Sequence, residues 1–197
     1  MSEEAQSVRS RLLDAGKKEF LEQGYGKSSL RKICAAAGVT TGALYFFFES
    51  KADLFDQVVG KVVVQLKEMS RDMIEKELED PSVAIENEKR LLEFLWSNRE
   101  VAVILMDKSE GTVYEGFSEE LVRGLETAFG RFFAKQGSAG AADPALIRIL
   151  VKMKLQGYME LLTGGYTLER TLELAEMLGW YTDGGFTCLT EKLNHRM

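Results

Sequence analysis

The sequence is poor in the residues that interrupt or cross-link a chain. Only two of its 197 residues are proline and only two are cysteine. Long helices are therefore possible, and a disulfide scaffold is not expected. The sequence also lacks an uninterrupted apolar run long enough to span a membrane, and its polar N-terminus has no apolar leader. We therefore expect a cytoplasmic protein.

Histidine is nearly absent, which bears on catalysis and metal binding. His195 and Cys188 would supply only two ligands, fewer than the four of a structural zinc site. A Gly-rich phosphate loop, a Glu-x-x-His motif and the spacing of a nucleophilic triad are missing as well. We expect no enzyme, no metal and no cofactor. A helical carrier of a small apolar molecule, or a protein-interaction module, remains open among the functions that need no catalysis.

Charge is distributed unevenly along the chain. The net charge is −6, yet residues 8–51 carry eight Lys or Arg residues and four Asp or Glu residues. The remainder, from residue 52 onward, is acidic. A basic end on an acidic body is compatible with an approach to phosphates. Ordinary solvated surface explains the same charges equally well.

Apolar residues recur at helical spacing along most of the chain and predict an all-α fold. Gly24 is expected to end the first helix in a left-handed cap, and Ser28 to cap the second. A small-residue linker is expected at residues 136–143. The predicted helices are 4–22, 28–37, 40–47, 51–79, 80–98, 101–108, 118–135, 144–162 and 167–193.

The second and third helices resemble a helix-turn-helix, because they are short and are joined by a tight turn at Gly38. The third helix opens with "TTGA", residues 40–43. A recognition helix must bring its first turn deep into the major groove, which bulky side chains there would prevent. Small residues also leave the backbone N–H groups open to phosphate. The structural alternative is that Thr40 and Thr41 serve only as helix caps.

Four consecutive aromatic residues follow, Tyr45 to Phe48. At 100° per residue, Leu44 and Phe48 share one helix face, which is expected to be buried. Tyr45 and Phe46 lie on the opposite side, where they would stand beside a sugar-phosphate backbone. Phe47 falls between the two faces. We therefore expect the row to divide into core and contact residues.

Residues 8–55 resemble the DNA-binding domain of the TetR family of transcriptional regulators. The resemblance is carried by "RSRLLDAGKKEFLEQGY", "SSL", "AAAGVTTGALYFFF" and "SKADLF". It implies a homeodomain-like three-helix DNA-binding domain over residues 1–50. A larger helical ligand-binding and dimerisation domain would follow over residues 51–197. The resemblance further implies a homodimer formed by the last two helices and repression relieved by a small ligand.

The resemblance and the pattern of the recognition helix together name the expected DNA contacts. Phe47 departs from the family, since many relatives have a histidine or tyrosine there. Gly16 stands where alanine is usual. Arg31 is as compatible with solvated surface as with a phosphate contact. The expected contact residues are Lys27, Ser28, Ser29, Arg31, Thr40, Thr41, Gly42, Ala43, Tyr45, Phe46 and Lys51.

Beyond residue 66 the body is rich in aromatic residues and methionine. Such an interior could enclose an apolar ligand, because methionine adapts to varied shapes. Simple filling of a core explains the same residues. The candidate ligand-binding residues are Phe94, Met106, Tyr114, Phe117, Phe129, Phe133, Met153 and Tyr158.

The last two predicted helices carry apolar stripes suited to a four-helix dimer contact. A dimer is expected because two recognition helices must reach successive major grooves about 34–36 Å apart. We therefore expect a homodimeric repressor that binds a palindromic operator in double-stranded DNA and is released by a small apolar or aromatic effector. The candidate interface residues are Ile147, Val151, Lys154, Leu155, Leu162, Leu172, Leu178, Trp180 and Phe186.

Overall fold

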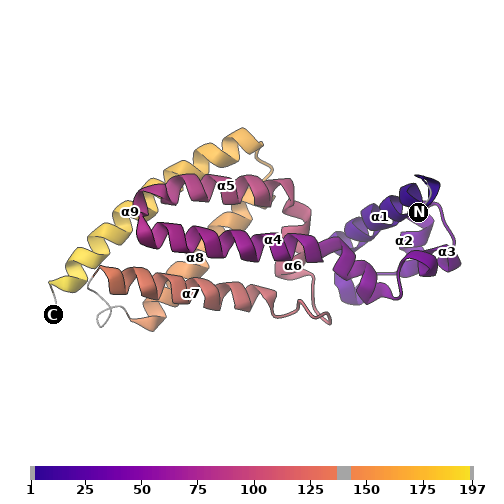
Figure 1. The fold of residues 1–197 in the computed structure, drawn as a ribbon, viewed down its shortest axis with the longest axis horizontal. Helices are drawn as coiled ribbons and strands as arrows, with labels where there is room; N and C mark the ends of the chain where they lie inside the picture. The colour runs from indigo at the N-terminus through magenta and orange to yellow at the C-terminus, as the bar shows by residue number, and fades with distance from the viewer. Residues whose placement is uncertain (1–2, 137–142, 196–197) are drawn as a thin grey trace. The chain divides into compact units, whose positions relative to one another are not determined.

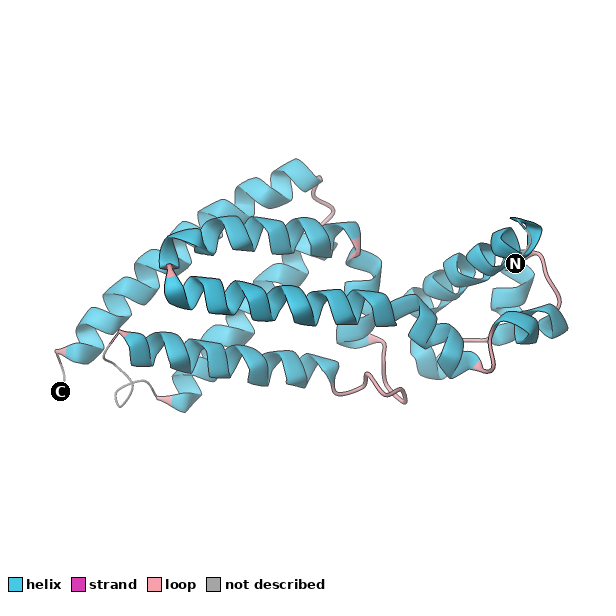
Figure 2. Ribbon diagram, in the orientation of Figure 1, coloured by secondary structure: helices cyan, strands magenta, loops and turns pink. Residues whose placement is uncertain are grey.

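The computed structural model describes residues 3–136 and 143–195, and every regular element in these ranges is a helix (Figures 1 and 2). The predicted all-α fold is confirmed. Most of the predicted linker, residues 137–142, lies outside the described residues. The helices are α1 (Glu3–Lys27), α2 (Leu30–Ala37), α3 (Thr41–Phe47), α4 (Lys51–Glu79), α5 (Ala84–Ser97), α6 (Arg99–Asp107), α7 (Phe117–Lys135), α8 (Pro144–Thr163) and α9 (Leu168–Asn194), with a short 3-10 helix, Pro81–Val83, before α5.

Side-chain caps begin several of these helices where the sequence predicts them. The hydroxyl oxygen of Thr40 accepts a hydrogen bond from the N–H of Ala43 at 3.2 Å, at the start of α3. Asp80 and Asp143 each accept from the N–H two residues later, and each is followed by proline at the first helical position. These residues satisfy N–H groups that have no partner inside the helix.

The end of α1 and the start of α2 differ from the prediction. Gly24 has φ 72° and ψ 163°, a conformation that only glycine adopts readily and that is not the expected left-handed cap. The chain then makes one more helical turn, so α1 ends at Lys27. Ser29, not Ser28, caps α2, and its hydroxyl accepts from the N–H of Lys32 at 3.4 Å. The extra turn after Gly24 explains the shift of the cap by one residue.

The described chain divides into two compact units, and helix α4 contributes to both. Unit 1 contains the residues up to Leu66 together with Glu100–Ser118. Unit 2 contains Lys67–Arg99 and the residues from Glu119 onward. The N-terminal helices therefore share a unit with the first half of α4, with most of α6 and with the segment that follows α6.

Unit 1 has a core built from α1 to α4. Gly16 of α1 allows a close approach of α4, because a Cβ atom at this position would lie 3.2 Å from Leu54 Cδ2. The unusual glycine at position 16 therefore has a packing reason. The fully buried side chains of this core are Leu12, Phe20, Ile33, Leu44, Phe48, Leu54, Phe55 and Val59.

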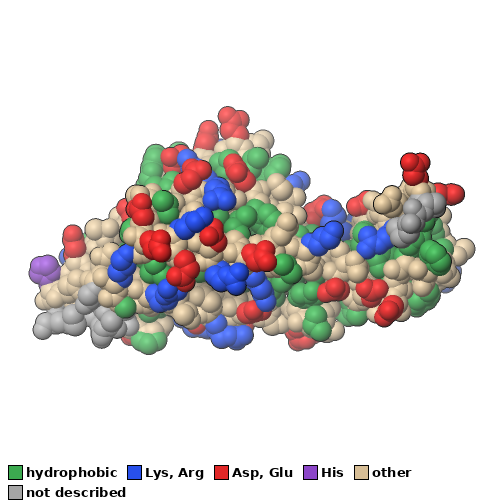
Figure 3. Space-filling view, in the orientation of Figure 1, with side chains coloured by type: hydrophobic (Ala, Val, Ile, Leu, Met, Phe, Trp, Pro, Cys, Tyr) green, Lys and Arg blue, Asp and Glu red, His purple; other side chains and the backbone are tan. Residues whose placement is uncertain are grey.

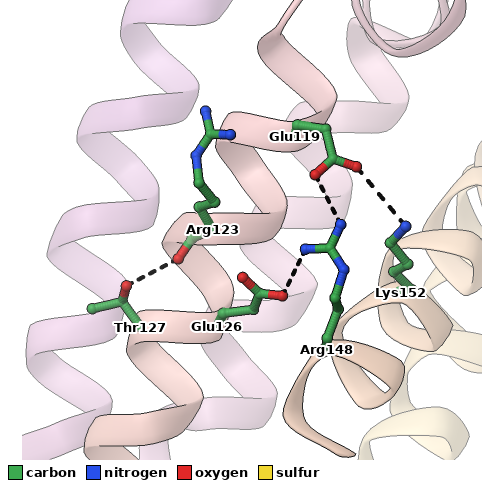
Figure 4. Close-up of polar contacts among 6 residues, drawn as sticks. All are labelled: Glu119, Arg123, Glu126, Thr127, Arg148 and Lys152. Carbon is green, nitrogen blue, oxygen red and sulfur yellow. Dashed lines mark hydrogen bonds and ion pairs between the residues drawn. The ribbon is translucent and has the colours of Figure 1, made fainter. Parts of the chain in front are cut away.

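Unit 2 is a helical bundle whose surface helices are linked by ion pairs. Arg131 of α7 forms a bidentate pair with Glu75 of α4, at 2.7 and 3.0 Å. Arg148 of α8 lies between Glu119 and Glu126 of α7, at 3.0 and 2.9 Å (Figure 4). Basic and acidic side chains are interspersed over the visible face of this unit (Figure 3). Each exposed pair contributes little alone, but the shared Arg148 holds two turns of α7 against α8.

The interior of unit 2 combines an apolar cluster with a polar group. Leu92, Leu161 and Ala175 are buried together where α5, α8 and α9 meet. One turn away on α5, Glu88 accepts a hydrogen bond from the Tyr158 hydroxyl at 2.9 Å and pairs with Lys154 at 3.2 Å. The Glu88 carboxylate is partly buried, and both Tyr158 and Lys154 provide hydrogen-bond donors to it. In residues 3–136 and 143–195, no helix is both long enough and apolar enough to cross a membrane.

Candidate nucleic-acid interface

A glycine turn joins α2 to α3 and fixes their geometry. Gly38 lies in the left-handed region, with φ 68° and ψ 35°. Its N–H donates to the carbonyl of Ala35 at 3.1 Å, and the N–H of Val39 donates to the carbonyl of Cys34 at 2.9 Å. These two bonds form a Schellman motif, which ends α2 and requires a residue that tolerates positive φ. The predicted tight turn is confirmed.

Helix α3 presents the side chains that the recognition-helix interpretation requires. Thr41 and Gly42 are exposed at its N-terminal end. Tyr45 and Phe46 are 54% and 78% exposed, whereas Phe48 is buried. The expected burial of Phe48 is thus confirmed, and the contact role of the exposed Tyr45 and Phe46 stays a prediction. A large apolar side chain left almost wholly in water at this position is a candidate for contact with a partner.

Phe47 lies at the boundary of the exposed face. Its ring is partly buried and meets the ring of Phe46 edge-on, with centroids 5.1 Å apart. A phenyl ring has no hydrogen-bond donor, so the polar backbone contact that a histidine or tyrosine could make at this position is not available here.

The residues before and within α2 divide into exposed and engaged groups. Lys27 and Arg31 are exposed, as a phosphate contact requires. Ser29 is partly buried; its hydroxyl caps α2, and its N–H donates to Glu19 Oε1 at 3.1 Å. Ser28 is buried, and its hydroxyl donates to the carbonyl of Tyr25 at 2.7 Å. The Ser28 side chain is therefore committed to the inside of the domain rather than exposed for DNA.

Lys51 begins α4, but its ammonium group lies against the protein. Nζ donates to the carbonyl of Tyr25 at 2.7 Å and to the carbonyl of Ser28 at 3.2 Å. The expected phosphate contact would have to compete with both bonds. Ser50 and Asp53 form the predicted capping interaction beside it, with the N–H of Asp53 donating to the Ser50 hydroxyl at 3.1 Å.

Tyr25 is a residue whose importance sequence reasoning missed. Its N–H donates to the carbonyl of Lys108 at 2.9 Å, and its ring packs edge-on against Phe55 with centroids 5.2 Å apart. The residue after α6 is thereby bonded to the last turn of α1. No local pattern could have revealed this contact, because the partner lies far along the chain.

The eight candidate ligand-binding residues are divided between the two units. Met106, Tyr114 and Phe117 belong to unit 1, whereas the other five belong to unit 2. Phe133 is fully buried against Phe186, whereas Met153 is 57% exposed. Helical spacing identified apolar side chains correctly but could not tell which helix face turns inward.

The structure has an open cleft of about 440 Å³ on unit 1, beside α4. Tyr114 is the member of the candidate ligand set that lines it among the described residues. Most of the residues that line the cleft are polar or charged types, but the greater part of its exposed lining surface is apolar. The lining residues are Asp56, Gln57, Gly60, Lys61, Val64, Gln65 and Tyr114.

The candidate dimer residues also divide between core and surface. Val151 and Leu162 are buried within the subunit, and Lys154 pairs with Glu88. Ile147, Leu155, Leu172 and Phe186 are partly buried, the last against Phe133. Leu178 and Trp180 are exposed. The predicted stripe therefore faces the subunit's own core along much of its length.

A different set of apolar side chains on α8 and α9 is left in water. Only two of these residues, Leu178 and Trp180, belong to the predicted interface stripe. The set offers the apolar surface that a subunit interface needs. We refer to them as the α8–α9 apolar face. Its members are Ile149, Met153, Met177, Leu178, Trp180 and Tyr181.

The N-terminal helices are similar to a family of known proteins. Residues 12–58 match the model of the bacterial regulatory proteins of the tetR family. The chain is 45% identical over 58 residues to the HTH-type transcriptional repressor BepR of Brucella suis biovar 1, covering 29% of this chain and 28% of that one. It is 35% identical over 60 residues to the HTH-type transcriptional regulator TtgR of Pseudomonas putida, covering 30% and 29%. The matches thus span less than a third of these curated relatives, which are named as regulators of transcription and not as enzymes.

Solved structures extend the likeness in fold beyond the matched residues. A transcriptional regulator of Aquifex aeolicus is 23% identical and covers 86% of this chain and 96% of its own, with a TM-score of 0.56. A TetR-like transcriptional regulator of a Rhodococcus species is 17% identical and covers 90% and 96%, with a TM-score of 0.61. At such identities these likenesses concern the fold alone. The match of residues 12–58 to the tetR family model supports the resemblance over the N-terminal helices, and the solved structures support an all-helical fold beyond them.

Proposed function

We propose that this protein is a DNA-binding transcriptional regulator whose helix α3 enters the major groove. The observation that carries this proposal is the exposed face of α3, with small residues at its N-terminal end and Tyr45 and Phe46 in water beyond them. Small residues let the helix end approach the base edges, and threonine can meet the thymine methyl group. The match of residues 12–58 to the tetR family supports the same role.

The exposed side chains on and beside α2 and α3 indicate which residues would contact DNA. Thr41, Gly42 and Ala43 would face base edges, while Tyr45 and Phe46 would lie along the sugar-phosphate backbone. Lys27 and Arg31, both exposed, would pair with phosphates, which position the domain without reading sequence. Ser29 would contribute through its position at the start of α2, between the exposed Lys27 and Arg31.

The same proposal includes a homodimer that reads a palindromic operator. Two copies of α3 must reach major grooves about 34–36 Å apart, which one subunit cannot do. The α8–α9 apolar face supports the dimer, since Trp180 and Tyr181 are 59% and 73% exposed in the single chain. The residues over 1–50 would form the DNA-binding domain, and residues 51–197 the regulatory and dimerisation domain.

Repression in the cytoplasm, relieved by a small effector, completes the proposal. BepR is named a repressor, which supports this direction of control. An effector can release the operator only by binding more tightly to a conformation that does not fit DNA. The eight candidate ligand-binding residues are divided between the two units, so they do not define a binding site. Binding assays with small apolar and aromatic molecules would identify the effector.

The experiment is a fluorescence anisotropy titration with a duplex that carries the inverted repeat upstream of the protein's own gene. Wild-type protein should bind this duplex more tightly than a shuffled one, with a steep loss of affinity as salt rises. Tyr45→Ala should weaken binding without changing the thermal unfolding temperature. Lys61→Met, a substitution on an exposed part of α4 outside the proposed interface, should bind like wild type.

Two results would contradict the proposal. The first is equal affinity for the repeat and the shuffled duplex at every salt concentration. The second is unchanged affinity in Tyr45→Ala and in a companion variant, Thr41→Ala. A protein that bound no duplex at low salt would instead favour the alternative of a helical carrier.

A further inference from the structure

The ammonium group of Lys51 is held by three groups of unit 1. Nζ donates to the carbonyl of Tyr25 at 2.7 Å and to the carbonyl of Ser28 at 3.2 Å. Nζ also lies 4.4 Å from the centroid of the Tyr25 ring, a distance at which the cation is attracted to the face of the ring. Two of the three ammonium donors are therefore used inside the protein.

These contacts have a structural cause in the backbone of α1. The break at Gly24 ends the regular hydrogen-bond pattern, so the carbonyls of the last turn need other donors. Lys51 supplies a charged donor to the carbonyl of Tyr25, in that turn, and to the carbonyl of Ser28, which follows the helix. The Tyr25 carbonyl also accepts from the Ser28 hydroxyl at 2.7 Å and from the Ser28 N–H at 3.2 Å. Hydrogen bonds from a charged donor are about twice as strong as neutral ones.

The start of α2 depends on these carbonyls. Ser28 directly precedes the cap residue Ser29, and Arg31 follows in the first turn of α2. Movement of the Ser28 carbonyl would therefore shift the cap and the exposed Arg31 together. The Tyr25 N–H also donates to the carbonyl of Lys108 at 2.9 Å. The segment from Tyr25 to Ser28 is therefore held by Lys108 at its first residue and by Lys51 at its last.

We infer that Lys51 is a positioning residue for DNA binding, which acts through Tyr25 and Ser28 and does not touch a phosphate. This inference rests on the proposed function and departs from the phosphate contact that the family resemblance implies. The ammonium group has one donor left, so a phosphate would have to share it with two charge-assisted hydrogen bonds and the ring of Tyr25. Lys27, which is exposed, can meet a phosphate without such competition.

The salt dependence of DNA binding separates the two roles. Each lost phosphate contact lowers the slope of log K against log salt by about 0.9. Lys51→Met should weaken binding about tenfold at every salt concentration, because charge-assisted hydrogen bonds are lost, with the slope unchanged. Lys27→Met, the matched substitution at an exposed lysine, should lower the slope.

A second measurement needs no DNA. Hydrogen exchange at the amides of Tyr25 and Ser28 reports directly on the segment that Lys51 holds. In the free protein, Lys51→Met should accelerate exchange at these amides about tenfold, whereas Lys27→Met should leave them unchanged. Lys51→Gln, which keeps a polar group on a shorter side chain, provides the same comparison where Lys51→Met does not fold.

The outcomes distinguish this inference from the proposed function. A Lys51→Met slope that falls as in Lys27→Met would overturn the positioning role, as would unchanged affinity or unchanged exchange. Wild-type protein that binds no duplex would overturn the proposed function, whatever the exchange rates. Weakened binding with an unchanged slope and faster exchange is the result that we expect.

Discussion

The hydroxyl of Tyr114 donates a hydrogen bond to Oδ1 of Asp56, and Gly60 lies directly beneath this pair on α4. A Cβ atom at position 60 would lie 3.3 Å from the Tyr114 hydroxyl oxygen and 3.5 Å from Asp56 Oδ1. Glycine inside a helix costs about 1 kcal/mol relative to alanine. Its presence in the middle of α4 therefore has a reason: it leaves room for the segment after α6 to dock.

Gly60→Ala should consequently stabilise the protein less than an alanine placed in open space. Gly124→Ala on α7 is the matched control, because no atom lies within 4 Å of its added Cβ, and it should gain about 0.5–1 kcal/mol. In a Tyr114→Phe background the crowding hydroxyl is gone, so Gly60→Ala should approach the gain of the control. Urea unfolding of the single and double variants measures these differences.

Equal effects of Gly60→Ala in the two backgrounds would show that the Tyr114 hydroxyl does not crowd position 60. The loop that carries Tyr114 is itself well hydrogen-bonded. Thr112 donates its hydroxyl to the carbonyl of Ser109 at 2.7 Å and accepts from the N–H of Tyr114 at 3.0 Å. The Tyr114 contact is therefore made by an ordered segment, and its loss should be measurable.

Local sequence patterns predicted the helices and their caps well. Thr40 and Asp143 cap the helices that they were expected to cap, and Phe48 is buried while Phe46 is exposed. Each of these features depends on residues within about one helical turn, which a sequence pattern can represent. The boundary error at Ser28 came from the conformation of Gly24, since glycine tolerates several positive-φ conformations and its sequence position does not say which.

Contacts between distant segments could not be predicted in the same way. The bond from Tyr25 to Lys108 and the placement of Lys51 depend on how α6 and α4 pack against α1. The assignment of Val151 to a dimer interface failed for a related reason. An apolar stripe on a helix does not reveal whether its partner is the same subunit or another, because both interiors have similar chemistry.

Thr171 of α9 is completely buried, and its hydroxyl oxygen has no hydrogen-bond partner among the described residues. Valine has nearly the same shape without the hydroxyl. Thr171→Val should therefore raise the free energy of unfolding by about 1–2 kcal/mol, since an unsatisfied buried polar group is removed.

Thr190→Val on the same helix is the matched control for Thr171→Val. The hydroxyl of Thr190 donates to a backbone carbonyl, with Phe186 at 3.1 Å and Thr187 at 2.9 Å. Its replacement should lower stability by about 1 kcal/mol, because a satisfied hydrogen bond is lost. Denaturant unfolding at one fixed protein concentration compares the two variants; a loss of stability in Thr171→Val would contradict the prediction.

Glu77 and Glu75, two residues apart on α4, should give opposite pH dependences. Burial raises the pKa of the Glu77 carboxyl, although Asn87 donates to it at 3.0 Å and Lys154 opposes the shift. The folded state therefore holds this proton more tightly than the unfolded state does. The stabilising contribution is fully present below the unfolded pKa near 4.5 and is lost as pH rises through the folded value. Glu77→Gln should accordingly stabilise the protein at pH 7 and have little effect at pH 4.

For Glu75 the sign is reversed. The hydrogen bonds from Arg131 lower the pKa of its carboxyl, so the folded state releases this proton more readily. That contribution is present above the unfolded pKa and is lost as pH falls, and Glu75→Gln should destabilise the protein at pH 7 rather than stabilise it. Unfolding measured between pH 4 and pH 8 distinguishes the two; the same sign for both variants at pH 7 would contradict this reading.

Trp180 and Val151 should separate subunit association from subunit folding. Trp180 is exposed on the α8–α9 apolar face, so Trp180→Glu should leave the fold of each chain intact but place a charge in the proposed interface. Val151 is buried within its own subunit, so Val151→Ala should lower stability by about 1–3 kcal/mol and leave the dimer assembled. Sedimentation velocity and circular dichroism on the same samples test both expectations. If the Trp180→Glu protein dimerises as wild type does, the dimer interface does not include Trp180, and the exposed indole must have another role.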